Sequence, residues 1–119
     1  MRTHQALNGR ADVIVPGDHL LGGPETDELV DIAKQLTAQG RHALLIDFHK
    51  VNQINSLALG ALTRIVIAYA KVNGKVKVCN LGSRVRGLFD IVLFNKLFEY
   101  YESEDTALEA FGREMAELV

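Results

Sequence analysis

ALLIDFHKVNQINSLALGALTRIVIAYAKVNGKVKVCN, residues 43–80, contains the pattern that decides the fold. Its beginning, residues 43–48, is a short apolar run without helix caps, which is typical of a strand buried on both faces. Apolar residues then recur at helical spacing over 56–72, and Asn73-Gly74 supplies a stop signal. The alternation in residues 75–80 predicts a half-exposed strand. A strand, a helix and a second strand in this order predict a right-handed crossover between parallel strands.

A hairpin is expected at the N-terminal end of the chain. Residues 3–7 and 10–15 flank Asn8-Gly9, a dipeptide suited to a two-residue type I′ turn because both positions accept positive φ. The sheet is therefore expected to be mixed, with an antiparallel pair at its start and parallel strands after it.

Three further helices and one further strand complete the expected order. A helix over residues 24–39 has Pro24 at its first position and Gly40 as its stop. The remaining elements are helices over 83–93 and 104–118 and a strand over 96–101. Together they predict an α/β fold: a single domain over residues 1–119, with a four- to five-stranded mixed sheet packed with about four helices.

The composition excludes several classes of protein. The chain is 48% hydrophobic and 24% charged, with a formal net charge of −2, whereas nucleic-acid binders usually carry a clustered basic surplus. No stretch approaches the roughly 20 apolar residues of a membrane helix, and no signal peptide is visible. We therefore expect no nucleic-acid partner, no membrane insertion and a cytoplasmic location. The single cysteine, Cys79, is expected to be a buried apolar residue of a strand.

Few residues could carry chemistry. The four histidines lack the spacing of a metal site. Gly17 precedes a helix, but the glycines there lack the spacing of a phosphate-binding loop. Asp47 lies near the carboxyl end of a buried strand, where ligands gather in open α/β sheets. Hydrogen bonding to loop amides is the favoured interpretation of Asp47, and a small-ligand pocket with Gly17 is an alternative. No nucleophile can be paired with a base, so we expect a protein that is not an enzyme and has no cofactor or metal.

Ser56 stands at the start of the longest apolar helix. Its hydroxyl is expected to cap that helix by accepting a hydrogen bond from an amide two or three residues further on. The helix also has an outer stripe at helical spacing, which consists of Leu57, Gly60, Arg64, Ile67 and Lys71. Small and apolar residues beside charges are typical of a docking surface. The alternative is that Leu57 and Ile67 lie under neighbouring loops.

The stretch INSLALG, residues 54–60, carries a resemblance to a known family. With the strand before it and the segments SRVRGLF and LFEYYESEDTALEAF after it, it resembles a STAS domain of the anti-sigma factor antagonist type. The signature of that family has the form I-D-S-S-G-L-G. Ile54, Ser56, Leu59 and Gly60 agree with the signature, whereas Asn55, Leu57 and Ala58 stand in place of its aspartate, its second serine and its first glycine.

The resemblance implies a regulatory protein-binding module that acts in transcription regulation. Its partner would be an anti-sigma factor that is also a serine kinase of the GHKL type, and Ser56 would be the phosphorylation site. The partner-binding residues would be Asn55, Leu57, Gly60, Arg64 and Ile67. The differences at Asn55 and Ala58 favour an alternative, an unphosphorylated accessory subunit of a transport or scaffolding complex. A homodimer is compatible with either interpretation.

Overall fold

The computed structural model describes residues 1–91 and 97–117, which form seven strands and four helices. The elements are β1 (Arg2–Ala6), β2 (Ala11–Val15), β3 (His19–Leu20), α1 (Pro24–Ala38), β4 (Ala43–Asp47), β5 (Gln53–Ile54), α2 (Ser56–Ala70), β6 (Lys75–Cys79), α3 (Ser83–Ile91), β7 (Glu99–Tyr101) and α4 (Glu104–Glu117). Parts of three expected elements, residues 92–93, 96 and 118, lie outside the described residues.

The main sheet is mixed and has the strand order β1-β2-β4-β6-β7. The pair β1–β2 is antiparallel, and the pairs β2–β4, β4–β6 and β6–β7 are parallel. The predicted α/β fold, with a hairpin at the start of a mixed sheet, is confirmed. The sequence did not predict the second, two-stranded sheet, in which β3 and β5 pair in parallel over two residues each.

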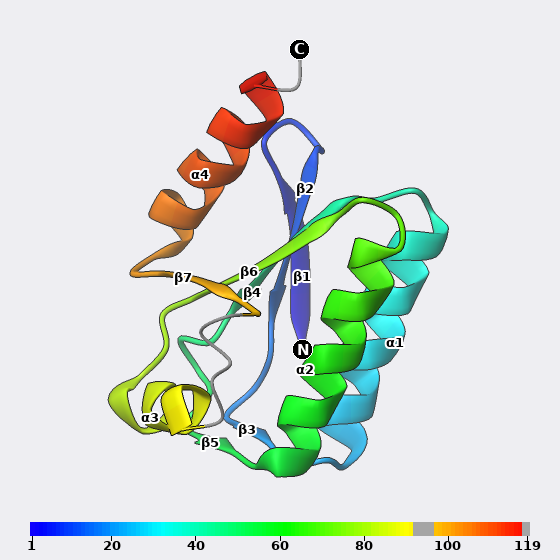
Figure 1. The fold of residues 1–119 in the computed structure, drawn as a ribbon. Coiled ribbons are helices and arrows are strands. Elements are labelled where there is room, and N and C mark those ends of the chain that lie inside the picture. Colours follow the sequence, from blue (N-terminus) through cyan, green and yellow to red (C-terminus); the bar gives the residue numbers. More distant parts are fainter. Residues whose placement is uncertain (92–96, 118–119) are drawn as a thin grey trace.

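Helices cover both faces of the main sheet (Figure 1). The helices α1 and α2 lie on one face and α4 lies on the other. The side chains of each strand alternate between the two faces, so the strands contribute to two separate cores. On β4, Leu44 and Ile46 join the core beneath α1 and α2, whereas Leu45 joins the core beneath α4. This double coverage explains why the whole of β4 is buried.

The strand β6 is more buried than its sequence suggested. A half-exposed strand was expected, but the residues from Val76 to Cys79 are all buried. The reason is that α4 and β7 cover the face on which Lys77 lies, and Glu99 and Glu114 bind the ammonium group of that lysine. Cys79 is buried as predicted, and its burial raises the pKa of the thiol.

The loop of the hairpin is wider than predicted. The last paired residues are Ala6 and Ala11, so the loop has four residues rather than two. Leu7, Asn8 and Gly9 all have positive φ. The guanidinium of Arg41 donates a hydrogen bond to the carbonyl oxygen of Gly9. A side chain far away in the sequence therefore stabilises the wider loop.

The helices α1 and α2 both begin at the end of the molecule where β3 and β5 pair (Figure 1). Pro24 begins α1 as predicted, and Gly40, with φ of +80°, follows its C-terminal cap. In the described ranges, no helix combines the length and the apolar character that crossing a membrane requires.

Candidate protein-binding site

The N-terminus of α2 is capped by Asn55 and not by Ser56. Asn55 has an extended backbone, and its Oδ1 accepts a hydrogen bond of 3.2 Å from the backbone amide of Ala58. Ser56 is the first residue inside the helix, and its side chain is exposed. The predicted cap at Ser56 was therefore wrong by one position. Asparagine is as good a capping residue as serine, so local preference alone could not decide between these neighbours.

Asn55 also ties the start of α2 to the loop before α1. Its Nδ2 donates a hydrogen bond of 3.0 Å to the carbonyl oxygen of Leu21. The Ala58 amide can only donate and the Leu21 carbonyl can only accept, so these two partners fix the orientation of the amide group. An aspartate would still cap the helix but could not donate to Leu21. The difference from the signature at position 55 thus has a structural role.

A second contact joins the same two segments. Gly22 has φ of +89°, and a β-carbon there would lie 2.7 Å from Cβ of Leu57. Leu57 therefore packs directly over the backbone of Gly22. Its side chain is still 66% exposed, and the neighbouring Leu21 is 40% exposed. Leu57 is thus not covered by a loop, and both segments joined here carry an exposed aliphatic residue.

We call this region the Ser56 surface and define it as Leu21, Asn55, Ser56, Leu57 and Gly60. Sequence reasoning missed Leu21. The available signal was the pair Leu20-Leu21 before two glycines, in which only one leucine can face the core. Leu20 is fully buried, so Leu21 faces outward.

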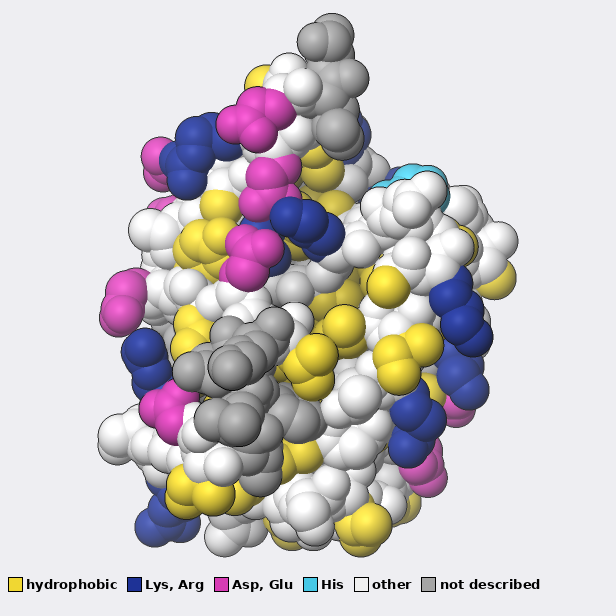
Figure 2. All heavy atoms as spheres, viewed as in Figure 1, with side chains coloured by type: hydrophobic (Ala, Val, Ile, Leu, Met, Phe, Trp, Pro, Cys, Tyr) yellow, Lys and Arg dark blue, Asp and Glu magenta, His cyan; other side chains and the backbone are white. Residues whose placement is uncertain are grey.

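The outer stripe of α2 continues from the Ser56 surface toward the C-terminal end of the helix. Arg64 and Ile67 are exposed, and Ile67 retains 49% of its accessible surface. On the opposite side of α2, Leu62 and Tyr69 are fully buried and Val66 is half-buried. Figure 2 shows hydrophobic side chains at the surface over α2, with Lys and Arg side chains along the adjoining edge.

Asp47 lies in a separate polar cluster at the carboxyl end of β4. Its Oδ1 accepts hydrogen bonds from the backbone amide of His49 at 2.9 Å and from Nδ2 of Asn80 at 3.0 Å. Burial raises the pKa of Asp47, but hydrogen bonds from Glu104, Asn80 and His49 outweigh it and lower that pKa to about 2. Hydrogen bonding to a loop amide, the favoured interpretation of Asp47, agrees with the structure.

Glu104, in the first turn of α4, is the partner that the sequence did not reveal. Its hydrogen bond to Asp47, with burial and the nearby charge of Asp47, raises the pKa of Glu104 to about 7. Below that pKa, a protonated Glu104 can donate to an ionised Asp47. The other residue of the suggested ligand pocket, Gly17, donates its amide to Oε1 of Glu25 at 2.8 Å. Each residue has local partners, and a ligand pocket at Asp47 and Gly17 stays a prediction.

The described residues hold no group of three or more His, Cys, Asp or Glu side chains that could bind a metal ion. The chemistry that the arrangement does offer is that of a surface: an accessible hydroxyl at a helix N-terminus, flanked by aliphatic side chains.

Comparison with known proteins decides the family. The model of the STAS domain matches residues 24–107. The chain belongs to the STAS domain family. The matched region of this STAS domain runs from the start of α1 into α4 and includes the Ser56 surface except for Leu21. No curated protein sequence matches the chain.

Solved structures share the fold at low sequence identity. An anti-sigma-factor antagonist (STAS) domain protein from Planctomyces limnophilus superposes with a TM-score of 0.79 at 18% identity, covering 93% of this chain and 97% of that one. The anti-sigma factor antagonist SpoIIAA in its unphosphorylated form gives a TM-score of 0.73 at 12% identity, covering 94% and 96%. SpoIIAA, a Bacillus cell fate determinant, has also been solved in its phosphorylated form.

Another similar structure belongs to a protein of a different kind. The murine anion transporter Slc26a9 superposes with a TM-score of 0.68 at 15% identity. The match covers 83% of this chain but only 17% of the transporter, so the likeness concerns one part of a much longer protein. The STAS fold thus occurs both in small antagonist proteins and within a transporter.

Proposed function

We propose that this STAS domain is an anti-sigma factor antagonist that binds a serine kinase of the GHKL type through the Ser56 surface. The unmodified chain binds the kinase, which is also the anti-sigma factor, and phosphorylation of Ser56 releases it. The domain itself is a binding module without catalytic activity, and it acts in the cytoplasm in transcription regulation.

One observation carries this proposal: the exposed Ser56 lies at the start of α2 between Asn55, which is hydrogen-bonded to Leu21, and the exposed Leu57. A kinase needs an accessible hydroxyl, and a partner needs apolar surface that is not already covered. Neither leucine is required by the core, because Leu20, Leu59 and Leu62 fill it. Their exposure is best explained by a partner that buries them.

The effect of phosphorylation follows from charge. A phosphoserine carries about −1.5 to −2 charge at neutral pH, and the N-terminus of a helix tolerates it. The same charge beside two leucines that contact a partner would have to be desolvated, which opposes binding. Phosphorylation of Ser56 would therefore leave the fold intact and weaken the complex.

The test compares two charge substitutions at matched positions. Ser56→Asp should weaken binding to a GHKL kinase encoded beside this chain by about tenfold or more, roughly 1.4 kcal/mol. Ser83→Asp is the control, because Ser83 is also exposed and also begins a helix, α3. Isothermal calorimetry measures both affinities. Equal affinities for the two variants would contradict the proposal.

Modification is measured separately. Incubation with the kinase and ATP should add one phosphate to Ser56, which mass spectrometry of the intact chain and its peptides detects. Ser56→Ala should abolish the modification and keep binding. Because Asn55 is the cap, Ser56→Ala should change the free energy of unfolding by no more than about 0.5 kcal/mol. A phosphate that appears on another residue would contradict the assignment of Ser56.

A second candidate function is an unphosphorylated accessory subunit of a transport complex. Two observations favour this function: the hydrogen bond from Asn55 Nδ2 to the Leu21 carbonyl oxygen, and the structural similarity to a segment of Slc26a9. In that case the Ser56 surface would bind a transporter subunit, Leu21→Asp and Leu57→Asp would weaken that complex, and no kinase would modify Ser56. The absence of phosphate together with binding to such a subunit would decide for this function.

A further inference from the structure

A shallow groove lies between the C-terminal halves of α1 and α2, away from the Ser56 surface. Lys34 and Ala38 line it from α1, and Arg64, Ile67, Ala68 and Lys71 line it from α2. The groove has a volume of about 530 Å³. Ala38 and Ala68 contribute small side chains to its lining, which also includes Thr37 and Val72.

The α2 side of the groove forms one continuous face. Arg64, Ile67, Ala68 and Lys71 follow the spacing i, i+3, i+4 and i+7, which places them in line along the helix. The half-exposed Ile67 and Ala68 form an apolar centre, with a cation one turn before and another one turn after it. On α1, Lys34 precedes Ala38 by one turn and repeats the pattern.

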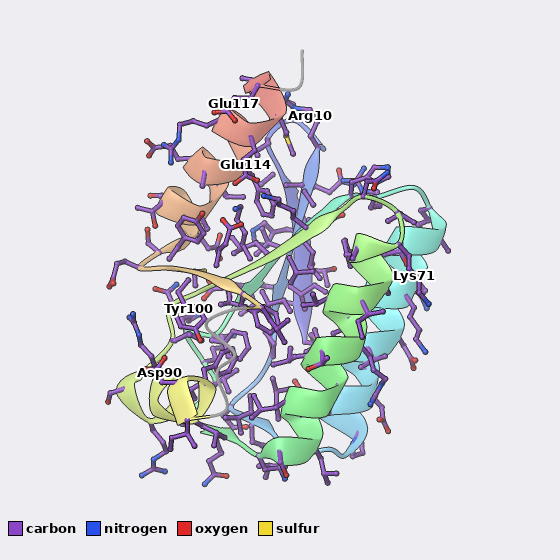
Figure 3. All side chains as sticks on the ribbon, viewed as in Figure 1. Arg10, Lys71, Asp90, Tyr100, Glu114 and Glu117 are labelled. Atoms are coloured by element: carbon purple, nitrogen blue, oxygen red, sulfur yellow. The ribbon has the colours of Figure 1, made fainter. Side chains whose placement is uncertain are left out.

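The charge of this groove differs from that of the whole chain. The formal net charge of the protein is −2, yet Lys34, Arg64 and Lys71 carry three positive charges around one apolar centre. Among the described residues, none of these three cations forms an ion pair. Asp31 lies one turn before Lys34 on α1. Figure 3 shows Lys71 beside α1, with Glu114 and Glu117 far away on α4.

We infer that this groove binds an acidic amphipathic helix of a partner protein. The inference rests on the proposed function and adds to it a second contact on the same kinase. A helix with an apolar stripe between carboxylates would bury Ile67 and pair its acids with Lys34, Arg64 and Lys71. The distance from Arg64 to Lys71 is seven residues at 1.5 Å each, roughly 10 Å, which matches about two turns of such a helix.

Other anionic partners fit the groove less well. Insertion into a membrane needs protruding apolar side chains, but Ile67 is the one large exposed aliphatic residue among the groove residues that the structure describes. A nucleic acid would present a long run of phosphates to a chain of net negative charge, and no aromatic side chain lines the described groove for stacking. A short acidic helix requires only the local positive charge.

The probe is a synthetic 14-residue peptide with leucines at helical spacing flanked by glutamates. A peptide of the same composition in scrambled order is its control. The full chain, labelled with ¹⁵N, is titrated with each peptide and with vesicles of anionic phospholipid. We expect shift changes at Lys34, Ile67 and Lys71 with the amphipathic peptide, and an affinity that falls as salt is raised. Equal binding of the scrambled peptide, changes confined to other surfaces, or preference for the vesicles would overturn the inference.

Two double variants with the same change of charge complete the test. The double variant with Arg64→Glu and Lys71→Glu should weaken peptide binding by about tenfold. Each substitution removes an attraction to a glutamate of the peptide and introduces a repulsion. Lys50→Glu with Arg84→Glu, both exposed and outside the groove, should change it less than about twofold. Circular dichroism checks that both variants fold.

The same variants separate the failure of this inference from the failure of the proposed function. Kinase binding that responds to Ser56→Asp but not to the groove variant would overturn the groove alone. Kinase binding that responds to neither would overturn both. A response to both, with the Lys50→Glu and Arg84→Glu control unaffected, would support the groove as the second contact.

Discussion

Lys77 Nζ lies 2.7 Å from Glu114 Oε2, so a fully buried lysine of β6 is paired with the C-terminal half of α4. Glu99 and the hydroxyl of Tyr101 also bind this ammonium group, which lies 4.9 Å from the ring centroid of Phe111. Burial alone would lower the pKa of Lys77, but the hydrogen bonds to Glu114 and Glu99 outweigh it and raise that pKa. The lysine is therefore charged within the core that α4 covers.

Replacing Lys77 with methionine should be far less harmful than replacing it with alanine. Methionine fills the same volume, and Lys75, 3.5 Å from Glu99 and 3.6 Å from Glu114, can still balance the two carboxylates. We expect Lys77→Met to cost about 1 kcal/mol of stability and Lys77→Ala about 3 kcal/mol, because alanine also leaves a cavity. Urea unfolding measures both. Equal losses of stability in the two variants would mean that the charge of Lys77, and not the packing of its aliphatic side chain, stabilises the fold.

The two hydrogen bonds of Asn55 can be separated by substitution. Asn55→Asp keeps an acceptor for the Ala58 amide and loses only the donor to Leu21, so we expect a cost of about 1 kcal/mol. Asn55→Ala loses both and should cost about 2 kcal/mol. Chemical denaturation gives the stabilities, and amide exchange should show faster opening around Gly22 in both variants. A fully stable Asn55→Asp protein would show that the bond to Leu21 contributes nothing.

Gly22 should tolerate no side chain, whereas its neighbour Gly23 should. Alanine at Gly22 would need φ of +89° and would clash with Leu57 at 2.7 Å, so we expect a loss of about 2 kcal/mol. At Gly23 φ is −98° and no atom lies within 4 Å of an added β-carbon, so Gly23→Ala should cost less than about 0.5 kcal/mol. Thermal unfolding of the two variants side by side tests this. If Gly22→Ala also displaces Leu57, partner binding should fall with it.

The pair Asp47 and Glu104 should make stability depend on pH in two windows. The pKa of Glu104 is raised from 4.5 to about 7, so the folded state holds its proton more tightly and stability falls as pH rises from 4.5 to 7. The pKa of Asp47 is lowered from 3.8 to about 2, so its contribution is complete above 3.8 and is lost as pH falls toward 2. The stabilisation from this pair is therefore largest near pH 4.

Glu104→Gln isolates the upper window. Glutamine can still donate to Asp47 but does not titrate, so the variant should lose the fall in stability between pH 4.5 and 7 and be the more stable protein at pH 8. The ionisable side chains near Glu104 are Asp47, His49, Arg2 and His4. His4 lies 3.6 Å from Glu104 and His49 lies 3.0 Å from Asp47, so His4→Gln and His49→Gln are the controls. An unchanged pH profile in Glu104→Gln would show that another group causes it.

Much of the fold could be predicted because its signals are local. The apolar run at 43–48, Pro24 at the start of α1 and the helical spacing after Ser56 each act over a few neighbouring residues, and each predicted element is present. The predictions were wrong where contacts with distant segments determine the local structure. The four-residue hairpin loop depends on Arg41, and the burial of β6 depends on α4. The two-residue strands β3 and β5 are too short to leave a periodic signal.

For the candidate site, the sequence by itself determined that a serine begins an amphipathic helix whose outer stripe bears Leu57, Arg64 and Ile67. Those properties follow from spacing along one helix, which the chain order specifies. Only the tertiary structure decided that Asn55 and not Ser56 is the cap, that the segment of Leu21 and Gly22 lies against the start of α2, and that Glu104 hydrogen-bonds to Asp47. The contacts of Asn55 with Leu21, of Gly22 with Leu57 and of Glu104 with Asp47 join segments tens of residues apart. They exist only because the sheet and its two layers of helices bring these segments together.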